Sequence, residues 1–312
     1  MSLTMSASAM KKSDIAALLL LGALWGASFL FMRVGAAQFG SMALAGVRAI
    51  GAAICSIPLL MSRERLAELR ANWLSITLIG LSNSALPFVL FSYAAQSLPA
   101  GLSAIFDAIA PLLVALSGWL WLGERLNGTQ ASGLVIGMTG VVWLIDGSMG
   151  FGHGGATVGW AMAACVGANV CYTFGAHYSH RRVQSVSPLT VAIGSQVAAA
   201  VMLLPSTVWL WPAKSPTLQA WIAMFGLAAA CTSLAYVLFY RLLARIGSTR
   251  SMAVLYLIPV FGVVWGAMFL HESITLAMAG GSAVILLGVA LTTGMLKPRP
   301  APPAPLDAIE KA

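Results

Sequence analysis

The chain has 312 residues, of which 59% are hydrophobic and only 8% are charged, compared with about 25% charged residues in an ordinary soluble domain. This composition excludes a typical soluble globular protein and indicates a chain that lies mainly in lipid. The net charge of +8 does not indicate a nucleic-acid-binding protein, because the basic residues are spread over loops and do not gather on one soluble face.

Apolar runs of about twenty residues recur along the whole sequence, and each is long enough to cross about 30 Å of hydrocarbon. The first run follows Lys11 and Lys12 but exceeds the apolar core of a signal peptide, so we expect it to be retained. We predict an all-α membrane protein with ten transmembrane helices near residues 15–34, 41–61, 72–95, 101–122, 130–147, 157–180, 188–210, 217–240, 249–270 and 276–296.

The basic residues of the loops predict the orientation of these helices. A cytoplasmic N-terminus places fourteen Lys and Arg residues on the cytoplasmic side and only Lys214 in an outside loop. The positive-inside rule therefore predicts that both termini are cytoplasmic. We expect residues 1–14 to form a cytoplasmic N-terminus, residues 148–156 a periplasmic linker, and the Pro-rich residues 297–312 a disordered cytoplasmic tail.

The sequence offers little support for an enzyme. Its four cysteines lie in predicted helices without a CxxC pair, which argues against a disulfide framework or a zinc ribbon. His177 and His180 have a metal-like spacing, but two ligands do not make a site. The chain also lacks an HExxH, GxSxG or P-loop motif. We therefore predict no catalytic residue, no metal and no cofactor.

One helix pattern occurs twice. Residues 110–124 read APLLVALSGWLWLGE, and residues 258–272 read IPVFGVVWGAMFLHE. The same offset of 148 residues relates Pro111 to Pro259, Gly118 to Gly266, Glu124 to Glu272, Trp73 to Trp221 and Arg33 to Arg181. Each copy holds five predicted helices, and because five is odd the second copy crosses the membrane in the opposite sense. We predict two inverted repeats, residues 15–147 and 157–296, an organisation typical of secondary transporters with alternating access.

These two copies resemble EamA-type units of the drug/metabolite transporter superfamily over about residues 12–296. The resemblance rests on LWGASFLFMRVGA at 24–36, on the two helices ending in Gly-Glu-Arg and His-Glu-Ser, and on the glycines of the fifth and tenth helices. Within the superfamily the chain is most similar to bacterial exporters of aromatic amino acids and methionine. The resemblance implies a multi-pass protein of the bacterial inner membrane, with a site between the third, fourth, eighth and ninth helices and with moving first and sixth helices.

From this resemblance we expect export of aromatic amino acids, methionine, similar neutral amino acids and related metabolites by alternating access. The alternatives are export of other small metabolites or cationic drugs and, more remotely, a membrane-embedded enzyme. Its partners are then a small-molecule substrate and the lipid bilayer, with no nucleic acid. We expect a monomer or a weak homo-oligomer, and the sequence leaves open whether transport is coupled to protons.

Asp107 is the acidic residue that lies well inside a predicted helix, roughly 9 Å below the outer surface. An unpaired carboxylate in lipid costs several kcal/mol, which makes this residue a candidate for function. It could bind the ammonium group of an amino acid, couple transport to protons, or pair with Arg48 at a similar depth. The sequence leaves these alternatives open.

Prolines and glutamates mark candidate bends and gates. Pro87, Pro111 and Pro259 each remove one helical hydrogen bond, freeing the carbonyls of Asn83, Asp107 and Leu255. Each proline could therefore bend a helix or expose a carbonyl to substrate. Glu124 and Glu272 lie at helix ends, where each has a basic neighbour with which to pair, Arg125 and His271.

Polar and aromatic side chains complete the predicted site. Asn169, Thr173 and His177 recur at i, i+4 and i+8 on one helical face, where they could line a wet cavity or bind neighbouring helices together. Deep aromatic residues could wall a pocket for an apolar side chain or simply pack in the core. The predicted substrate-binding residues are Trp25, Asn83, Asp107, Asn169, Tyr172, His177, Tyr236 and Tyr256.

Overall fold

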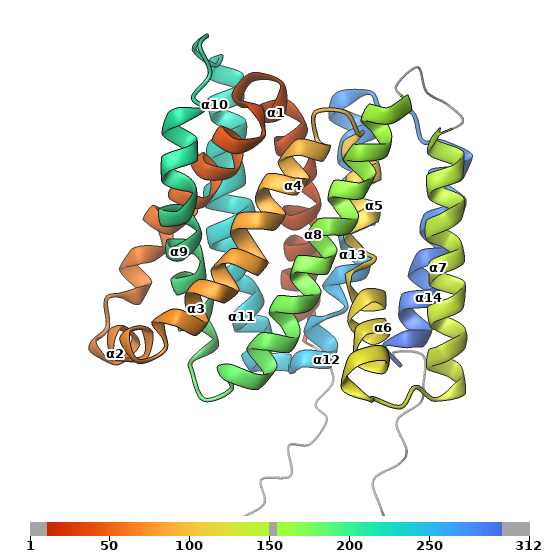
Figure 1. The fold of residues 1–312 in the computed structure, drawn as a ribbon, viewed down its shortest axis with the longest axis horizontal. Coiled ribbons are helices and arrows are strands. Elements are labelled where there is room, and N and C mark those ends of the chain that lie inside the picture. The colour runs from red at the N-terminus through yellow and green to blue at the C-terminus, as the bar shows by residue number, and fades with distance from the viewer. Residues whose placement is uncertain (1–10, 150–154, 295–312) are drawn as a thin grey trace, which may run out of the picture.

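The computed structural model describes residues 11–149 and 155–294, and all regular structure within these ranges is helical. Figure 1 shows the helices standing side by side in one bundle. Seven helical segments are apolar and long enough to cross a membrane, and two shorter apolar helices accompany them. The chain is therefore a multi-pass all-α membrane protein, as its composition predicts. The predicted tail at 297–312 lies outside the described residues, as do residues 1–10 and most of the predicted linker.

In chain order, the elements of the described residues are all helices or π-helical turns. They are α1 (Lys12–Leu60), α2 (Arg63–Ala71), α3 (Trp73–Gly80), η1 (Leu81–Ala85), α4 (Leu86–Ala94), α5 (Ala100–Asp107), α6 (Ala110–Leu122), α7 (Gly128–Met149), α8 (Gly155–Arg182), α9 (Pro188–Trp209), α10 (Leu218–Phe225), η2 (Gly226–Leu234), α11 (Ala235–Ile246), α12 (Ser248–Ser251), α13 (Val254–Leu270) and α14 (Leu276–Thr292). The π-helical turns η1 and η2 join their flanking helices into the membrane-length segments Trp73–Ala94 and Leu218–Ile246.

The first two predicted helices are both contained in α1, which consists of two helices joined by a sharp kink at Gly40. The 49 residues of α1 include Gly40, whose φ of 71° and ψ of 172° are not helical. Glycine adopts this positive φ without the steric cost that a Cβ would bring. Figure 1 shows α1, in red, crossing the bundle, turning over beside α10 and returning toward α2. Each half of α1 is long enough to match one predicted helix.

The two copies share local backbone features at the offset of 148 residues. This offset maps η1 onto residues 229–233, which lie within η2. It also maps Gly123 onto His271, and both residues end their helices with a positive φ, 69° and 53° respectively. Such left-handed residues are common helix C-caps. The repeated sequence pattern therefore corresponds to repeated backbone geometry.

The helix break associated with the repeated proline differs between the copies. Pro111 lies in the first turn of α6, directly after the break that separates α5 from α6, and a proline is favourable there because the first-turn N–H groups have no helical partner. Pro259 lies inside α13, which begins at Val254 and continues through it. The second copy therefore breaks earlier, between α12 and α13. Pro87 follows η1 in the first turn of α4.

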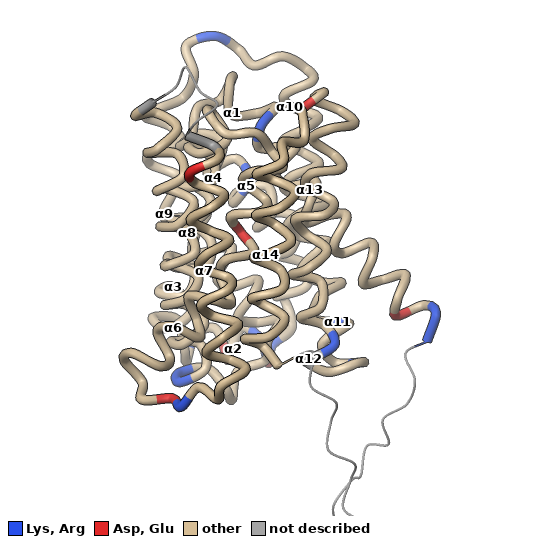
Figure 2. Tube along the Cα trace, turned by 90° about the vertical axis from the view of Figure 1, so that its right-hand side faces the viewer, with Lys and Arg blue, Asp and Glu red and all other residues tan. Residues whose placement is uncertain are grey.

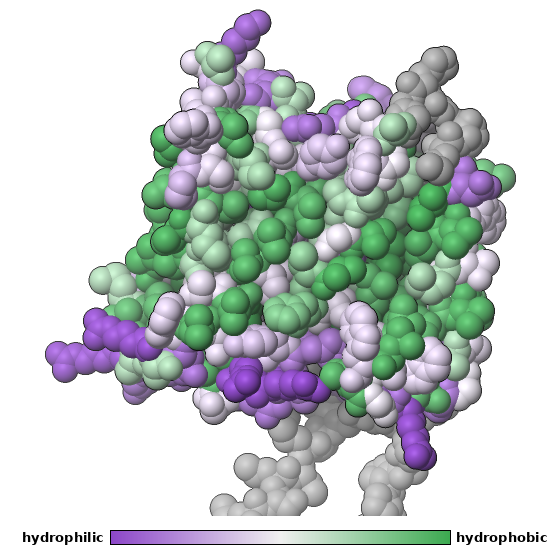
Figure 3. Space-filling view, in the orientation of Figure 1, coloured by the Kyte–Doolittle hydropathy of each residue, from purple (hydrophilic) through white to green (hydrophobic). Residues whose placement is uncertain are grey.

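The surface divides into an apolar middle and two polar ends. Figure 3 shows hydrophobic side chains across the middle of the bundle and hydrophilic ones toward its two ends. Figure 2 shows that Lys and Arg gather mainly at the end formed by α2, α12 and the α6–α7 connection, which we call the basic end. The apolar band is where lipid would surround the bundle.

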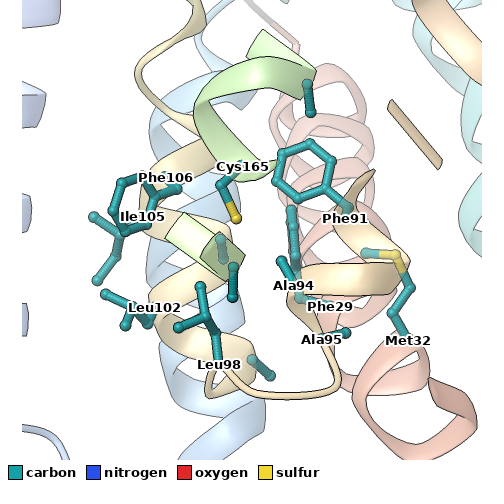
Figure 4. Packing of buried hydrophobic residues seen from close by; sticks show 14 of the residues in the cluster. Phe29, Met32, Phe91, Ala94, Ala95, Leu98, Leu102, Ile105, Phe106 and Cys165 are labelled. Carbon is teal, nitrogen blue, oxygen red and sulfur yellow. The ribbon is translucent and has the colours of Figure 1, made fainter. Parts of the chain in front are cut away.

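A shared core holds the helices around the middle of the bundle. Figure 4 shows its side chains gathered between α1, α4, α5 and α8, and the labelled residues include Phe29, Phe91, Ile105, Phe106 and Cys165. All four cysteines are free, and two of them, Cys165 and Cys231, are buried. These two are small packing residues of the core.

Candidate substrate cavity

A cavity of about 810 Å³ lies within the bundle. Its wall is formed by parts of α1, η1, α4, α5, α6, α8, α11, α13 and α14, with Glu124 from the α6–α7 connection and single residues from α7 and the α12–α13 turn. Most lining side chains are apolar or aromatic, with a few polar and charged groups among them. This composition is typical of sites that bind small organic molecules.

The fold brings most of the predicted binding residues together at this cavity. Six of the eight line it, namely Trp25, Asn83, Asp107, Tyr172, Tyr236 and Tyr256. Pro111 and Glu124 also line it, whereas Pro87, Pro259 and Glu272 do not. Asn169 and His177 likewise lie outside the lining. The third, fourth, eighth and ninth predicted helices all contribute to the wall, together with both halves of α1 and with α8 and α14.

Aromatic rings form two parts of the wall. Trp25 of α1 meets Tyr236 of α11 edge to face, with ring centroids 6.1 Å apart, and its ring lies 5.3 Å from that of Phe239. On the other side Phe91 contacts Phe29 at 5.5 Å and Tyr172 at 6.3 Å. Aromatic pairs at such distances interact favourably beyond their burial, so these rings support one another and offer apolar surfaces to a substrate.

Arg48 is a buried cation in the cavity wall, on the second half of α1, and it is only 8% exposed. Its Nε donates a hydrogen bond of 3.1 Å to Oγ1 of Thr232 in η2. Its guanidinium carbon lies 3.7 Å from the ring centroid of Phe88, within the range of a cation–π interaction. Thr232 donates in turn to the carbonyl of Leu227, five residues earlier. The π-helical turn thus presents the oxygen that orients Arg48.

Asp107 is the last residue of α5, next to the break before α6, and its side chain is partly exposed to the cavity. Among the described residues no hydrogen bond or ion pair within 4 Å engages its carboxylate. Arg48 and Asp107 line the same cavity, yet they do not form within 4 Å the ion pair that the sequence allows. Two opposite charges therefore face one cavity without neutralising each other by direct contact.

Two residues of the polar stripe of α8, Asn169 and His177, bind α8 to neighbouring helices, whereas Thr173 bonds within α8. Asn169 is fully buried, and its Nδ2 donates to the carbonyls of Phe106 at 3.0 Å and Cys165 at 2.8 Å. Nε2 of His177 hydrogen-bonds with Oγ of Ser117 in α6 at 2.9 Å. Thr173 donates to the Asn169 carbonyl at 2.8 Å. Of the two alternatives for this stripe, the structure shows contacts between helices, and the Asn169 contact supports the backbone one residue before Asp107.

The two repeated glutamates have different surroundings. Oε1 and Oε2 of Glu272 accept hydrogen bonds from the backbone N–H groups of Ala100, at 2.8 Å, and Gly101, at 3.2 Å. The carboxylate therefore caps the amino terminus of α5, where the helix dipole favours a negative charge. The predicted pairing of Glu272 with His271 is replaced by this cap. Glu124 is exposed, borders the cavity and has no side-chain hydrogen bond to the described residues.

Sequence reasoning considered Arg48 only as a partner for Asp107. It also missed Phe88 and Thr232, which hold the guanidinium in place. The available signal was the arginine itself, because a basic residue inside a membrane helix is costly and usually faces a bundle interior or a wet cavity. Thr232 gave no comparable signal, since a single threonine is common in apolar helices.

Comparisons with known proteins agree with this arrangement. The model of the EamA-like transporter family matches residues 12–145 and 159–294. The transporter YvbV of Bacillus subtilis is 26% identical over 86% of this chain and 87% of its own length. The inner membrane transporter YedA of Escherichia coli is 25% identical over 89% of each chain.

Two further similarities concern function and fold. A protein of Streptantibioticus cattleyicolor described as a probable terminal-alkyne amino-acid exporter is 26% identical over 88% of this chain and 90% of its own length. A solved crystal structure superposes with a TM-score of 0.64 at 19% identity, covering 92% of this chain and 99% of the other. Because the family model matches most of the sequence, in two successive segments, the chain belongs to the EamA-like transporter family and is a membrane transporter.

Proposed function

We propose that this protein is an inner-membrane secondary transporter that exports aromatic amino acids, methionine, similar neutral amino acids and related metabolites. The observation that carries the proposal is the cavity itself, in which the unpaired carboxylate of Asp107 lies among aromatic walls that include Trp25, Tyr172 and Tyr236. An ammonium group would neutralise the carboxylate, and an apolar side chain would pack on the rings. The similarity to a probable amino-acid exporter supports this substrate class and this direction.

The proposed topology has ten membrane-spanning helices with both termini in the cytoplasm. It counts α1 twice, because Gly40 divides it into two halves. The gathering of Lys and Arg at the basic end supports a cytoplasmic position for that end. The two segments that match the family model support a division into repeats at 15–147 and 157–296, and a five-helix unit gives them opposite orientations.

The proposed transport cycle is alternating access with Glu124 and Glu272 as gate residues. At the end opposite the basic end, Glu272 joins the α13–α14 connection to the start of α5. At the basic end Glu124, Gln130 and Thr293 border the cavity. These observations support a state that is closed toward the periplasm and open toward the cytoplasm. In the opposite state Glu124 would engage residues 248–249, which the offset of 148 makes equivalent to Ala100 and Gly101.

Other substrates of the superfamily remain the alternative. A lone carboxylate in the cavity would also suit cationic drugs, which is the observation that favours them. Arg48 in the same wall argues against a simple cation, since it would repel a positive charge in a low-dielectric site. The balance of the two charges therefore favours an overall neutral substrate.

Growth assays distinguish these substrate classes. We expect overproduction of the protein in a bacterial host to raise resistance to toxic analogues of phenylalanine and methionine, and we expect no change in sensitivity to lipophilic cations. The control is the Asp107→Asn variant, expressed at the same level in the membrane. Resistance to cations without resistance to analogues would overturn the amino-acid assignment and favour the drug exporter.

A further inference from the structure

Two charges of opposite sign, the buried Arg48 and the partly exposed Asp107, share the cavity without touching. Arg48 and Asp107 both line it, and no ion pair within 4 Å joins them. Unpaired charges away from water are costly, and a nearby opposite charge normally relieves that cost by direct pairing. A molecule that carries both complementary charges would relieve it for both residues at once.

We propose that Arg48 binds the carboxylate of the substrate while Asp107 binds its ammonium group, so that the cavity selects a zwitterion. This inference rests on the proposed function. It assigns recognition of the substrate's α-carboxylate to Arg48 and of its α-ammonium group to Asp107. The substrate side chain then lies against the aromatic walls. An apolar surface discriminates between side chains less strongly than Arg48 and Asp107 discriminate between charged groups.

The contacts of Arg48 prepare it for this role. Thr232 occupies Nε, and the ring of Phe88 covers one face of the guanidinium. Nη1 has only a 3.5 Å contact with the sulfur of Met32, a weak acceptor, and no hydrogen bond from Nη2 to the described residues is present. Nη2 is free toward the described residues and Nη1 has only this weak acceptor to give up, so the two terminal nitrogens can form the paired hydrogen bonds with which arginine binds carboxylates.

The backbone beside Asp107 is held by a contact with α8. Asn169 fixes the carbonyl of Phe106, the residue before it, and the break between α5 and α6 follows directly. The carboxylate lies seven residues after the start of α5, about 10 Å along the helix. Arg48 lies eight residues after Gly40, about 12 Å along α1. The two charges therefore lie at similar depths below the same end of the bundle.

A competition assay with three related probes tests the assignment. The purified protein in liposomes carries labelled phenylalanine, and unlabelled phenylalanine, phenethylamine and 3-phenylpropionate compete with it. Each of the last two probes lacks one charged group. We expect both to compete at least about tenfold more weakly than phenylalanine, because each leaves one protein charge unpaired.

Charge-specific variants separate the two halves of the site. Arg48→Gln should weaken competition by phenylalanine, which loses the partner of its carboxylate, but should not weaken competition by phenethylamine, which has no carboxylate. Asp107→Asn should likewise weaken competition by phenylalanine but not by 3-phenylpropionate, which has no ammonium group. Arg48→Lys should give an intermediate loss, because lysine keeps the charge but not the paired geometry. The matched control is Arg33→Gln, since Arg33 also lies on α1 but donates to the Ala95 carbonyl and does not line the cavity.

The outcomes separate a failure of zwitterion selection from a failure of the proposed amino-acid transport. Variants enter the comparison when they elute as one species in detergent and keep the wild-type near-ultraviolet spectrum. One outcome is that wild type carries phenylalanine while the three probes compete equally well in Arg48→Gln and in Arg33→Gln. In that case the assignment of Arg48 is wrong and amino-acid transport stands. Equal competition by all three probes would also overturn zwitterion selection. If wild type carries no amino acid, the proposed function itself fails.

Discussion

At the scale of single residues, Gly175 of α8 leaves the space that the side chain of Asn83 occupies beside the cavity. A Cβ at Gly175 would overlap Oδ1 of Asn83, and Oγ of Ser82 would also be too close. Because Asn83 lines the cavity, an added methyl group here would push a polar lining group out of place. The position therefore links close helix packing to the shape of the site.

We predict that Gly175→Ala lowers the affinity for labelled phenylalanine by roughly tenfold, since overpacking of this size costs about 1–3 kcal/mol and displaces Asn83. Equilibrium binding to the purified protein measures the effect. Gly167→Ala is the matched control, because the new Cβ on the same helix would lie 3.6 Å from Leu90, an ordinary contact. Equal affinities of the two variants would show that Asn83 does not take part in binding.

At the scale of helices, the break between α5 and α6 places Asp107 at a helix end facing the cavity. Pro111 begins α6 and lacks the N–H that would bond the Asp107 carbonyl in a continuous helix. Its counterpart Pro259 lies within the continuous α13 and outside the cavity wall. The copies thus carry the same proline with different consequences for the backbone.

Replacing each proline by alanine tests this difference. Pro111→Ala permits a continuous helix through Asp107, and we expect it to lower the initial rate of phenylalanine transport at least about fivefold by moving that carboxylate. Pro259→Ala adds a helical hydrogen bond without moving a break, so its transport should stay near wild type and its melting temperature should not fall. Similar rates for the two variants would contradict a special role for the α5–α6 break.

Hydropathy predicts much of the element order, because a run of about twenty apolar residues indicates a helix long enough to cross the hydrocarbon core of a membrane. It does not report hydrogen-bond register, so η1 and η2 could not be predicted, and neither could the short polar helix α2. The polar stripe of α8 has the same limit. Asn169 and Asn83 are both asparagines in apolar helices, and only the packing of α8 on α5 and α6 determines that Asn169 binds a carbonyl while Asn83 lines the cavity.

At the scale of the whole molecule, the two repeated glutamates have different contacts at the two ends of the bundle. Glu272 caps α5 at one end, while its equivalent Glu124 borders the cavity at the other. The sequence predicts the equivalence of these residues through the repeat. It does not predict the difference in their contacts, because in the proposed cycle each end closes in turn and the sequence does not specify which end is closed.

Removing the charge of either glutamate should change the side of the membrane from which the cavity can be reached. In a background without the four native cysteines, Ala110→Cys places a thiol in the cavity wall, where a membrane-impermeant maleimide can reach it through the open end. Glu272→Gln should raise labelling from the periplasmic side several-fold, because the amide caps α5 less well than a carboxylate. Glu124→Gln should lower it. Unchanged labelling in both variants would exclude these glutamates as gates.

The most direct test of the account is uptake of labelled phenylalanine into sealed liposomes that contain the purified protein, first without an ion gradient and then with a proton gradient. We predict equilibration above empty liposomes, inhibition by methionine, and slower uptake with weaker phenylalanine binding in the Asp107→Asn variant. Uptake only with the proton gradient would add proton coupling to this account. No uptake under either condition, by protein that is folded and correctly inserted, would contradict amino-acid transport.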